Sequence, residues 1–177
     1  MEPTTKSSSV NYGLYIGAIL SIWTILNYGI GNLELLVNFW IILLITPVLI
    51  ISIGVISTLK AKKIQGGYIN FKEAFTSYFI TVVVGFVLST LISYLIFNVI
   101  DTAAGLELID IATEKTVKMM ERFGAPSDQI ALQVAEIENQ DKGLQAQILQ
   151  VFQGIVMFSV IGLIVALIVK KSESKDA

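Results

Sequence analysis

Along this chain, long hydrophobic stretches alternate with polar segments, and each hydrophobic stretch is as long as a whole helix. Four stretches contain no charged side chain, and each is 25 to 27 residues long. These stretches are Ser7–Leu33, Leu35–Leu59, Ala74–Ile100 and Gly143–Val169. An α-helix rises about 1.5 Å per residue, so about 20 apolar residues cross a hydrocarbon layer roughly 30 Å thick. The pattern predicts four membrane-spanning helices, at about residues 11–31, 36–59, 74–100 and 148–169.

The first stretch is the least uniform, and a signal peptide is the alternative to a membrane span. Its single preceding lysine, Lys6, is offset by Glu2, and no small-x-small cleavage pattern follows the apolar part. Signal peptides carry a basic leading segment and such a cleavage site. We therefore favour a true span.

Composition agrees with a membrane class. Hydrophobic residues make up 54% of the 177 residues, and the mean hydropathy is +0.75. Four spans leave no room for a separate soluble enzyme domain, so the chain is predicted to be one membrane domain, residues 1–177. The predicted fold class is an all-α integral membrane protein.

Basic residues gather on one side of the membrane if the chain crosses it four times. Eight of the twelve lie in the terminal segments and in the loop between the second and third spans. They are Lys6, Lys60, Lys62, Lys63, Lys72, Lys170, Lys171 and Lys175. Segment 101–142 instead has nine acidic and four basic residues, a net charge of −5. Since basic residues near span ends tend to stay in the cytoplasm, both termini are predicted to be cytoplasmic.

The segment at about residues 102–142 is predicted to be an external amphipathic helical hairpin between spans three and four. Ala103–Phe123 has apolar residues at helical spacing, Gly124 and Pro126 are typical of a helix end, and Ser127 suits the start of a second helix. A break is expected at residues 139–143. The apolar faces can pack on each other, lie on lipid or bind a protein. Mutual packing is favoured, because paired amphipathic helices usually bury their faces together.

The loop before span three contains the most distinctive motif. Gly66-Gly67 permits a tight turn, and Asn70 with Glu73 forms a capping-box arrangement that starts the helix. The segment from Gly66 through Tyr68 and Phe71 to Phe75 resembles a bacterial family catalogued as domain of unknown function 4199. The resemblance extends to the order of spans, insert and Lys-rich tail. Members often show Asp-Pro after span three, whereas Asp101 is followed here by Thr102.

This resemblance implies a small multi-pass protein of the bacterial inner (plasma) membrane. It brings no activity, cofactor or catalytic residue.

Small residues recur within three of the predicted spans. They are Gly13, Gly17 and Ser21; Thr81, Gly85, Ser89 and Ser93; and Ser159, Gly162 and Ala166. Such stripes let helix backbones approach closely in lipid. They predict a tight bundle within one chain or a homodimer, and we favour the former because three spans carry them. Pro47 predicts a kink in span two, and Asn27, Asn38 and Asn98 are candidates for bonds between helices.

The residue types that carry most chemistry are missing. The chain has no His and no Cys, and all four charge-free stretches lack the ionisable groups that ion pathways and proton relays use. We predict no catalytic, cofactor-binding or metal-binding residue, no cofactor, no nucleic-acid partner and no enzyme activity.

Two functional hypotheses follow. The first is a membrane interaction or scaffold protein that contacts a protein partner through the external hairpin. The second is a small oligomeric carrier or pore for an uncharged or lipid-like substrate, suggested by Pro47 and the hydroxyl-lined face of span three.

The charge distribution makes a direct topological prediction. Reporters fused after Lys63 and after Gly124 should lie on opposite sides of the membrane, with Lys63 in the cytoplasm. Paired alkaline phosphatase and fluorescent-protein fusions measure this. Activity of the same reporter at both positions would contradict the predicted orientation.

Overall fold

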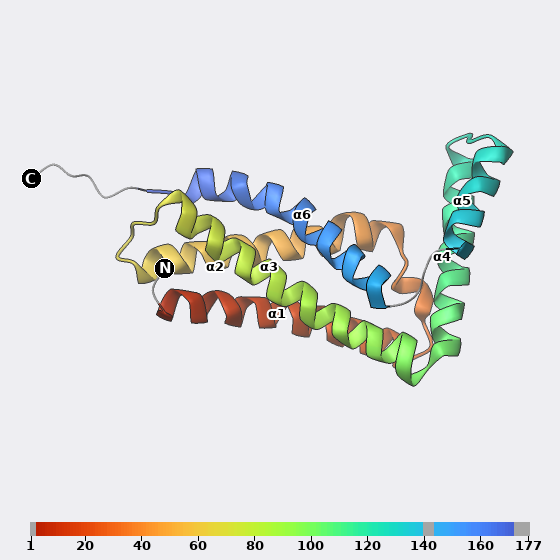
Figure 1. The fold of residues 1–177 in the computed structure, drawn as a ribbon, viewed down its shortest axis with the longest axis horizontal. Helices are drawn as coiled ribbons and strands as arrows, with labels where there is room; N and C mark the ends of the chain where they lie inside the picture. The colour runs from red at the N-terminus through yellow and green to blue at the C-terminus, as the bar shows by residue number, and fades with distance from the viewer. Residues whose placement is uncertain (1–2, 140–143, 172–177) are drawn as a thin grey trace, which may run out of the picture.

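The computed structural model describes residues 3–139 and 144–171. Of the predicted break at residues 139–143, Asn139 is the last residue of α5 and the rest lies outside the described part, as does Lys175. The long helices are α1 (Pro3–Gly29), α2 (Thr46–Ile64), α3 (Phe71–Tyr94), α4 (Thr102–Arg122), α5 (Ser127–Asn139) and α6 (Leu144–Val169). A short 3₁₀ turn, η1 (Leu33–Leu35), and two π-helical segments, η2 (Ile41–Ile45) and η3 (Leu95–Ile100), extend them. No strand occurs in the described residues, and the all-α fold class is confirmed (Figure 1).

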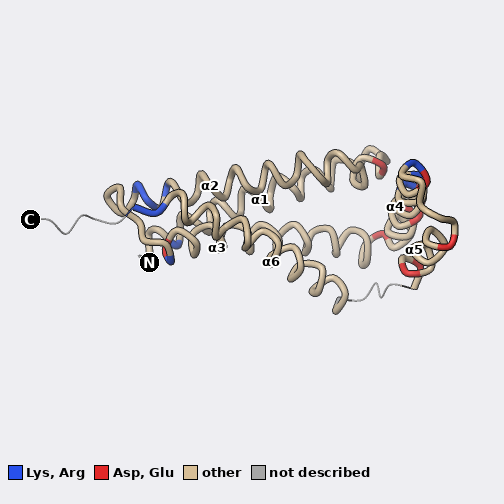
Figure 2. Tube along the Cα trace, turned by 90° about the horizontal axis from the view of Figure 1, so that it is seen from above, with Lys and Arg blue, Asp and Glu red and all other residues tan. Residues whose placement is uncertain are grey.

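Four continuous helical segments are long and apolar enough to cross a membrane. They are Pro3–Gly29, Ile41–Ile64, Phe71–Ile100 and Gln145–Val169. They form an elongated bundle with both ends of the chain at one end (Figure 1). Lysines gather at that end, whereas α4 and α5 at the other end carry acidic residues together with the basic residues of α4 (Figure 2). The four predicted spanning helices are confirmed, while the side of the membrane on which α4 and α5 lie stays a prediction.

The Gly-Gly motif between α2 and α3 forms the turn that its sequence predicts. Gly66 and Gly67 have φ angles of +74° and +94°, which side-chain-bearing residues rarely adopt. Asn70 Oδ1 then accepts a hydrogen bond from the Glu73 amide at 2.9 Å, and Asn70 Nδ2 donates to the Glu73 carboxylate at 2.8 Å. The predicted role of Asn70 as the N-cap of α3, with Glu73 at the third helical position, is therefore confirmed.

The same motif holds the end of α6. Ile69 and Lys171 exchange two backbone hydrogen bonds of 3.0 and 2.9 Å, and Ile69 is buried. Lys62 Nζ donates to the last helical carbonyl, Val169 O, at 2.8 Å. The Lys171 ammonium lies 5.4 Å from the centre of the Tyr68 ring, a cation–π distance. The motif thus joins the first and second halves of the chain at the lysine-rich end.

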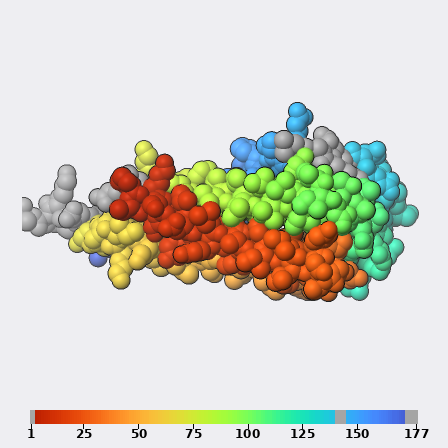
Figure 3. Space-filling model, turned by 90° about the horizontal axis from the view of Figure 1, so that it is seen from below, coloured from red at the N-terminus to blue at the C-terminus, as the bar shows by residue number. Residues whose placement is uncertain are grey.

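The small-residue stripes of α1 and α3 pack against each other within the chain. A Cβ placed on Gly13 would lie 2.7 Å from Thr81 O, and one on Gly85 would lie 2.7 Å from the Ile16 side chain. Gly17 faces Leu88 in the same way. Figure 3 shows the two helices side by side along one face of the bundle. The predicted use of these stripes inside one chain is confirmed for α1 and α3.

Tyr78 is the largest fully buried side chain, and two glycines make its space. A Cβ on Gly54 of α2 would lie 2.5 Å from the Tyr78 ring, and one on Gly162 of α6 would lie 2.6 Å from it. Among the described residues the Tyr78 hydroxyl has no hydrogen-bond partner. Packing of the ring therefore joins α2, α3 and α6.

Buried hydroxyl groups connect α1, α2 and α3 near the lysine-rich end. Ser9 Oγ lies 2.8 Å from Ser77 Oγ, and Ser57 Oγ lies 2.7 Å from Thr81 Oγ1. Thr81 Oγ1 also donates to the backbone carbonyl of Ser9 at 3.0 Å. Hydrogen bonds between transmembrane helices contribute about 0.6 kcal/mol each on average. This cluster therefore adds modest stability and fixes the register of three helices.

Span two accommodates Pro47 through a π-helical turn. The Thr46 amide donates to Ile41 O, five residues earlier, and Pro47 follows as the second residue of α2. Because proline lacks an N–H and its ring clashes with the preceding turn, the wider π register relieves both problems. The proline perturbation was predicted from sequence, whereas its π-helical form was not.

The packing of Tyr78 generates a stability prediction. Gly54→Ala and Gly162→Ala should each lower the free energy of unfolding by about 1–3 kcal/mol, because an added methyl group overpacks the ring. Thermal unfolding in detergent measures the change. Gly29→Ala is the matched control, since a Cβ at Gly29 meets nothing within 4 Å. Equal stability of all three variants would contradict this account of the bundle.

Candidate functional site

Helix α4 lies across the end of the bundle opposite the chain ends (Figure 1). Asp101 begins it, because its Oδ1 accepts from the Ala104 amide at 2.9 Å. Its Oδ2 accepts from the Tyr28 hydroxyl of α1 at 3.0 Å. The Ala104 amide and then the Tyr28 hydroxyl hold the pKa of Asp101 below its ordinary value, since both stabilise the charged carboxylate. Asp101 therefore both caps α4 and ties it to α1.

The first half of α4 is packed tightly onto the bundle. Gly105 lies so close to η3 that a Cβ there would collide with Phe97 O. Ala104, Phe97 and Leu33 belong to one buried cluster. At the far edge, Lys115 Nζ donates to Glu34 O at 2.8 Å and lies 3.4 Å from its carboxylate. These contacts fix α4 against the end of α1, η1 and η3.

Helix α5 is attached more loosely. It contacts α4, has no buried residue, and leaves Leu132 72% exposed. The turn between the helices includes Gly124 at φ +73°, as its sequence predicts. The apolar surface of α4 is thus divided between α5 and the bundle, whereas the sequence favoured packing of the two helices on each other.

Beneath α4 the spans enclose a half-open cavity of about 800 Å³. All four spans, including η2 and η3, contribute to its wall, together with α4 and Ile137 of α5. Its polar lining residues are Thr24, Thr46, Ser89, Ser93, Tyr94, Asn98, Thr102, Gln147 and Gln150. None of the lining residues is charged. Its volume lies within the range of about 300–1,000 Å³ that small-molecule sites usually have.

The cavity opens where the close contacts of the bundle end. Toward α4, the glycines of α1 give way to Leu20, Trp23 and Thr24, all of which line the cavity. Bulky residues at this level prevent the backbones from approaching as they do at Gly13 and Gly17. Figure 2 shows α6 diverging from the other spans toward this end. The glycine pattern therefore confines close packing to one half of the bundle.

Two of the hydroxyls that line the cavity already donate within their own helices. Thr24 Oγ1 donates to Leu20 O at 3.0 Å, and Ser89 Oγ donates to Phe86 O at 3.2 Å, so each proton is used within its own helix. Each oxygen keeps lone pairs for a second group. The amides of Asn98, Gln147 and Gln150 supply both donors and acceptors. Such a lining suits an uncharged molecule with hydroxyl or ester groups and an apolar body.

The hydroxyl stripe of α3 divides between two structural roles. Thr81 and Gly85 face α1 in the closely packed half, whereas Ser89 and Ser93 line the cavity. A four-residue spacing places all of them on one face, but the neighbours of that face change along the helix. The sequence identified the stripe and did not reveal this change.

Other polar residues differ from their predicted roles. Asn27 donates to Trp23 O of its own helix at 2.8 Å, and the carboxamide of Asn38 accepts from the Trp40 amide at 3.0 Å at the start of span two. Both were candidates for bonds between helices, and the structure gives them local bonds instead. Asn side chains commonly bond to backbone groups a few residues away, and both residues do so here. Asn98 instead lines the cavity.

Sequence reasoning missed the groups that anchor α4. Asp101 directly precedes a helical pattern, and aspartate is a preferred N-cap residue, so its capping role was detectable. The contacts Tyr28–Asp101 and Glu34–Lys115 join residues 73 and 81 positions apart, and no local pattern marks them.

Four apolar helices around an uncharged cavity define a multi-pass α-helical membrane protein. The chain matches the model of the family described as protein of unknown function (DUF4199) over residues 11–171, and it belongs to that family. The resemblance found in the Gly-Gly-Tyr segment is thereby confirmed. No curated protein and no solved structure matches the chain.

Proposed function

We propose that this protein binds an uncharged, lipid-like molecule in the cavity beneath α4 and acts as a small carrier or binding protein without a chemical step. The observation that carries the proposal is the uncharged, hydroxyl- and amide-bearing lining of a cavity of about 800 Å³ between the spans. A ligand with an apolar body and a hydroxylated end would bury its chain among Leu20, Ile41 and Phe97. Its polar end would bond to the side chains of Ser89, Ser93 and Asn98.

The proposed setting is the bacterial inner membrane, with both termini cytoplasmic. The lysines at the end that holds the chain ends support this orientation, because basic residues near span ends favour the cytoplasm (Figure 2). Helix α4 would then cover the cavity on the external side. Ligand exchange would occur in the leaflet nearest α4.

Binding can be measured through Trp23, which lines the cavity. In a Trp40→Phe background Trp23 is the single tryptophan, since the chain has two. A monoacylglycerol with a brominated chain, titrated into nanodiscs, should quench Trp23 saturably. Ser89→Leu with Ser93→Leu should weaken binding about tenfold, because two hydrogen bonds worth about 0.5–1.5 kcal/mol each are lost and the space is filled.

Ser52→Leu is the matched control for this titration. Ser52 is exposed on α2 and does not line the cavity, so its variant should bind as the unaltered protein does. Quenching that rises without saturation, and to the same extent in all three proteins, would show that the probe is only dissolved in the bilayer. That result would overturn the proposed function.

A second candidate function is an interaction or scaffold role through α5. The exposure of this helix favours that role. Leu132 is 72% exposed, and α5 contacts mainly α4. Apolar side chains at helical spacing are the anchors by which helices dock into partner proteins. The partner would be another protein or a second copy of this chain.

A photo-reactive residue at Leu132 tests the second function in intact cells. We expect a discrete protein adduct of reproducible mass, and an adduct of twice the chain mass would identify a second copy. The control is the same residue at Ile168, which is 76% exposed on the outer surface of α6 and should react with lipid. Absence of any protein adduct at Leu132 would exclude this role.

A further inference from the structure

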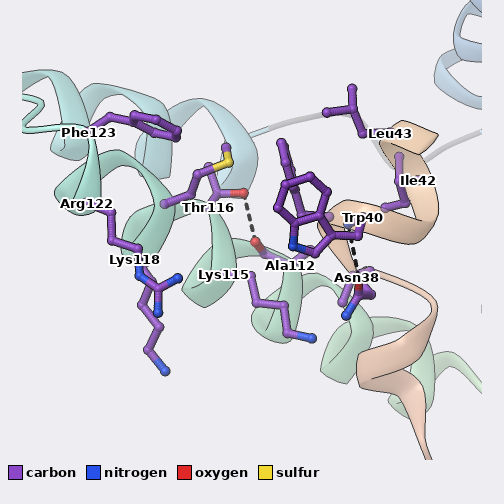
Figure 4. Close-up of a pocket in the computed structure, with 13 residues that line it drawn as sticks. Asn38, Trp40, Ile42, Leu43, Ala112, Lys115, Thr116, Lys118, Arg122 and Phe123 are labelled. Carbon is purple, nitrogen blue, oxygen red and sulfur yellow. Dashed lines mark hydrogen bonds between the residues drawn. The ribbon is translucent and has the colours of Figure 1, made fainter.

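A second hollow lies outside the bundle, between α4 and the start of span two. This groove has a volume of about 550 Å³. Figure 4 shows Trp40 on one side of it, facing the α4 side chains of Thr116 and Phe123. Lys115, Lys118 and Arg122 follow one another along the same side of α4. The groove therefore combines an apolar interior with a basic edge.

The basic edge continues the stripe by which α4 docks onto the bundle. Residues at alternating four- and three-residue steps share one helix face. Ala104, Leu108 and Ile111 pack on the bundle end, and Lys115 contacts Glu34 at its margin. The next steps on the same face are Lys118 and Arg122. Figure 1 shows α4 continuing past the bundle edge, and both residues line the groove there (Figure 4).

The charges along this edge leave a positive excess. Lys115 pairs with Glu34, and Lys118 pairs with Glu114. Arg122 has no ion-pair partner among residues 3–139 and 144–171. The hydrogen bond from Lys118 to Glu114 raises the pKa of Lys118 above its ordinary value, so this lysine is charged at neutral pH. The guanidinium fork of Arg122 suits bidentate binding of a phosphate group.

The apolar side of the groove is continuous with the lipid-facing surface of span two. Phe123 is 83% exposed, Trp40 is 63% exposed and Leu43 is 52% exposed. Leu43 lies in η2, within the segment long and apolar enough to cross the membrane. Tryptophan is enriched at the membrane–water interface. A bilayer around span two would therefore border the groove, with its headgroups near the basic edge.

We propose that this groove binds an anionic phospholipid from the leaflet nearest α4. The phosphate is held by Arg122 and Lys118, and an acyl chain lies between Met119 and Phe123 on one side and Trp40 and Leu43 on the other. The site is distinct from the cavity beneath α4, whose lining is uncharged. It would attach the projecting part of α4 to the membrane surface.

The test uses the full chain in phosphatidylcholine nanodiscs, with Trp23→Phe so that Trp40 is the single tryptophan. A minor fraction of either phosphatidylglycerol or phosphatidylcholine carries brominated chains. At equal mole fraction, brominated phosphatidylglycerol should quench Trp40 fluorescence more strongly than brominated phosphatidylcholine does. We expect phosphatidylglycerol to be enriched at the groove about fivefold for each basic residue near its headgroup, because each such residue contributes about 1 kcal/mol. Lys118→Gln with Arg122→Gln should abolish this preference.

Both substituted side chains are exposed, so folding is not at risk. Lys60→Gln with Lys63→Gln removes the same charge at the opposite end of the bundle and should leave the preference intact. Equal quenching by the two lipids would overturn the proposal, as would a preference that survives Lys118→Gln with Arg122→Gln. Neither result bears on ligand binding in the cavity, which is measured through Trp23.

Discussion

The structure depends on the close approach of helix backbones to α3. In lipid no hydrophobic force drives helices together, so association relies on packing and interhelical hydrogen bonds. Glycines provide that packing on both sides of α3. Gly13 and Gly17 let α3 lie close to α1, while Gly54 and Gly162 leave space for the Tyr78 ring. Because the same helix carries Ser77 and Thr81 into the hydroxyl cluster, one element organises all four spans.

This dependence also explains why one half of the bundle is closed and the other hollow. The close contacts lie toward the lysine-rich end, where the Gly-Gly-Tyr turn additionally pairs with the end of α6. At the other end Gly105 packs closely against Phe97, and polar contacts are added: Asp101 caps α4 and binds Tyr28, and Lys115 binds Glu34. Those contacts hold α4 in place but do not fill the cavity beneath it.

Sequence predicted the elements whose causes are local. Charge-free length predicts spans, Asn70 and Glu73 predict a helix start, and Gly85 predicts a close contact, because each depends on a few neighbouring residues. The cavity could not be predicted in this way. Ser89 and Thr81 stand at equivalent positions of one stripe, and only the neighbours supplied by α1 and α4 decide which of them is packed and which lines a cavity.

The placement of α4 makes the cavity and the groove depend on one helix. Ala112 of α4 and Ile42 of η2 border both hollows, so a displacement of α4 relative to span two changes the two together. The first half of α4 is fixed by Gly105 and Asp101, whereas the part beyond Lys115 has only α5 and the groove beside it. Lipid bound along that second half would therefore oppose lifting of the helix that covers the cavity.

A π-helical turn lies where the two hollows meet, at Ile41–Ile45, and its wider register already departs from ideal helix geometry. Span two therefore carries its irregular turn in the wall that both hollows share.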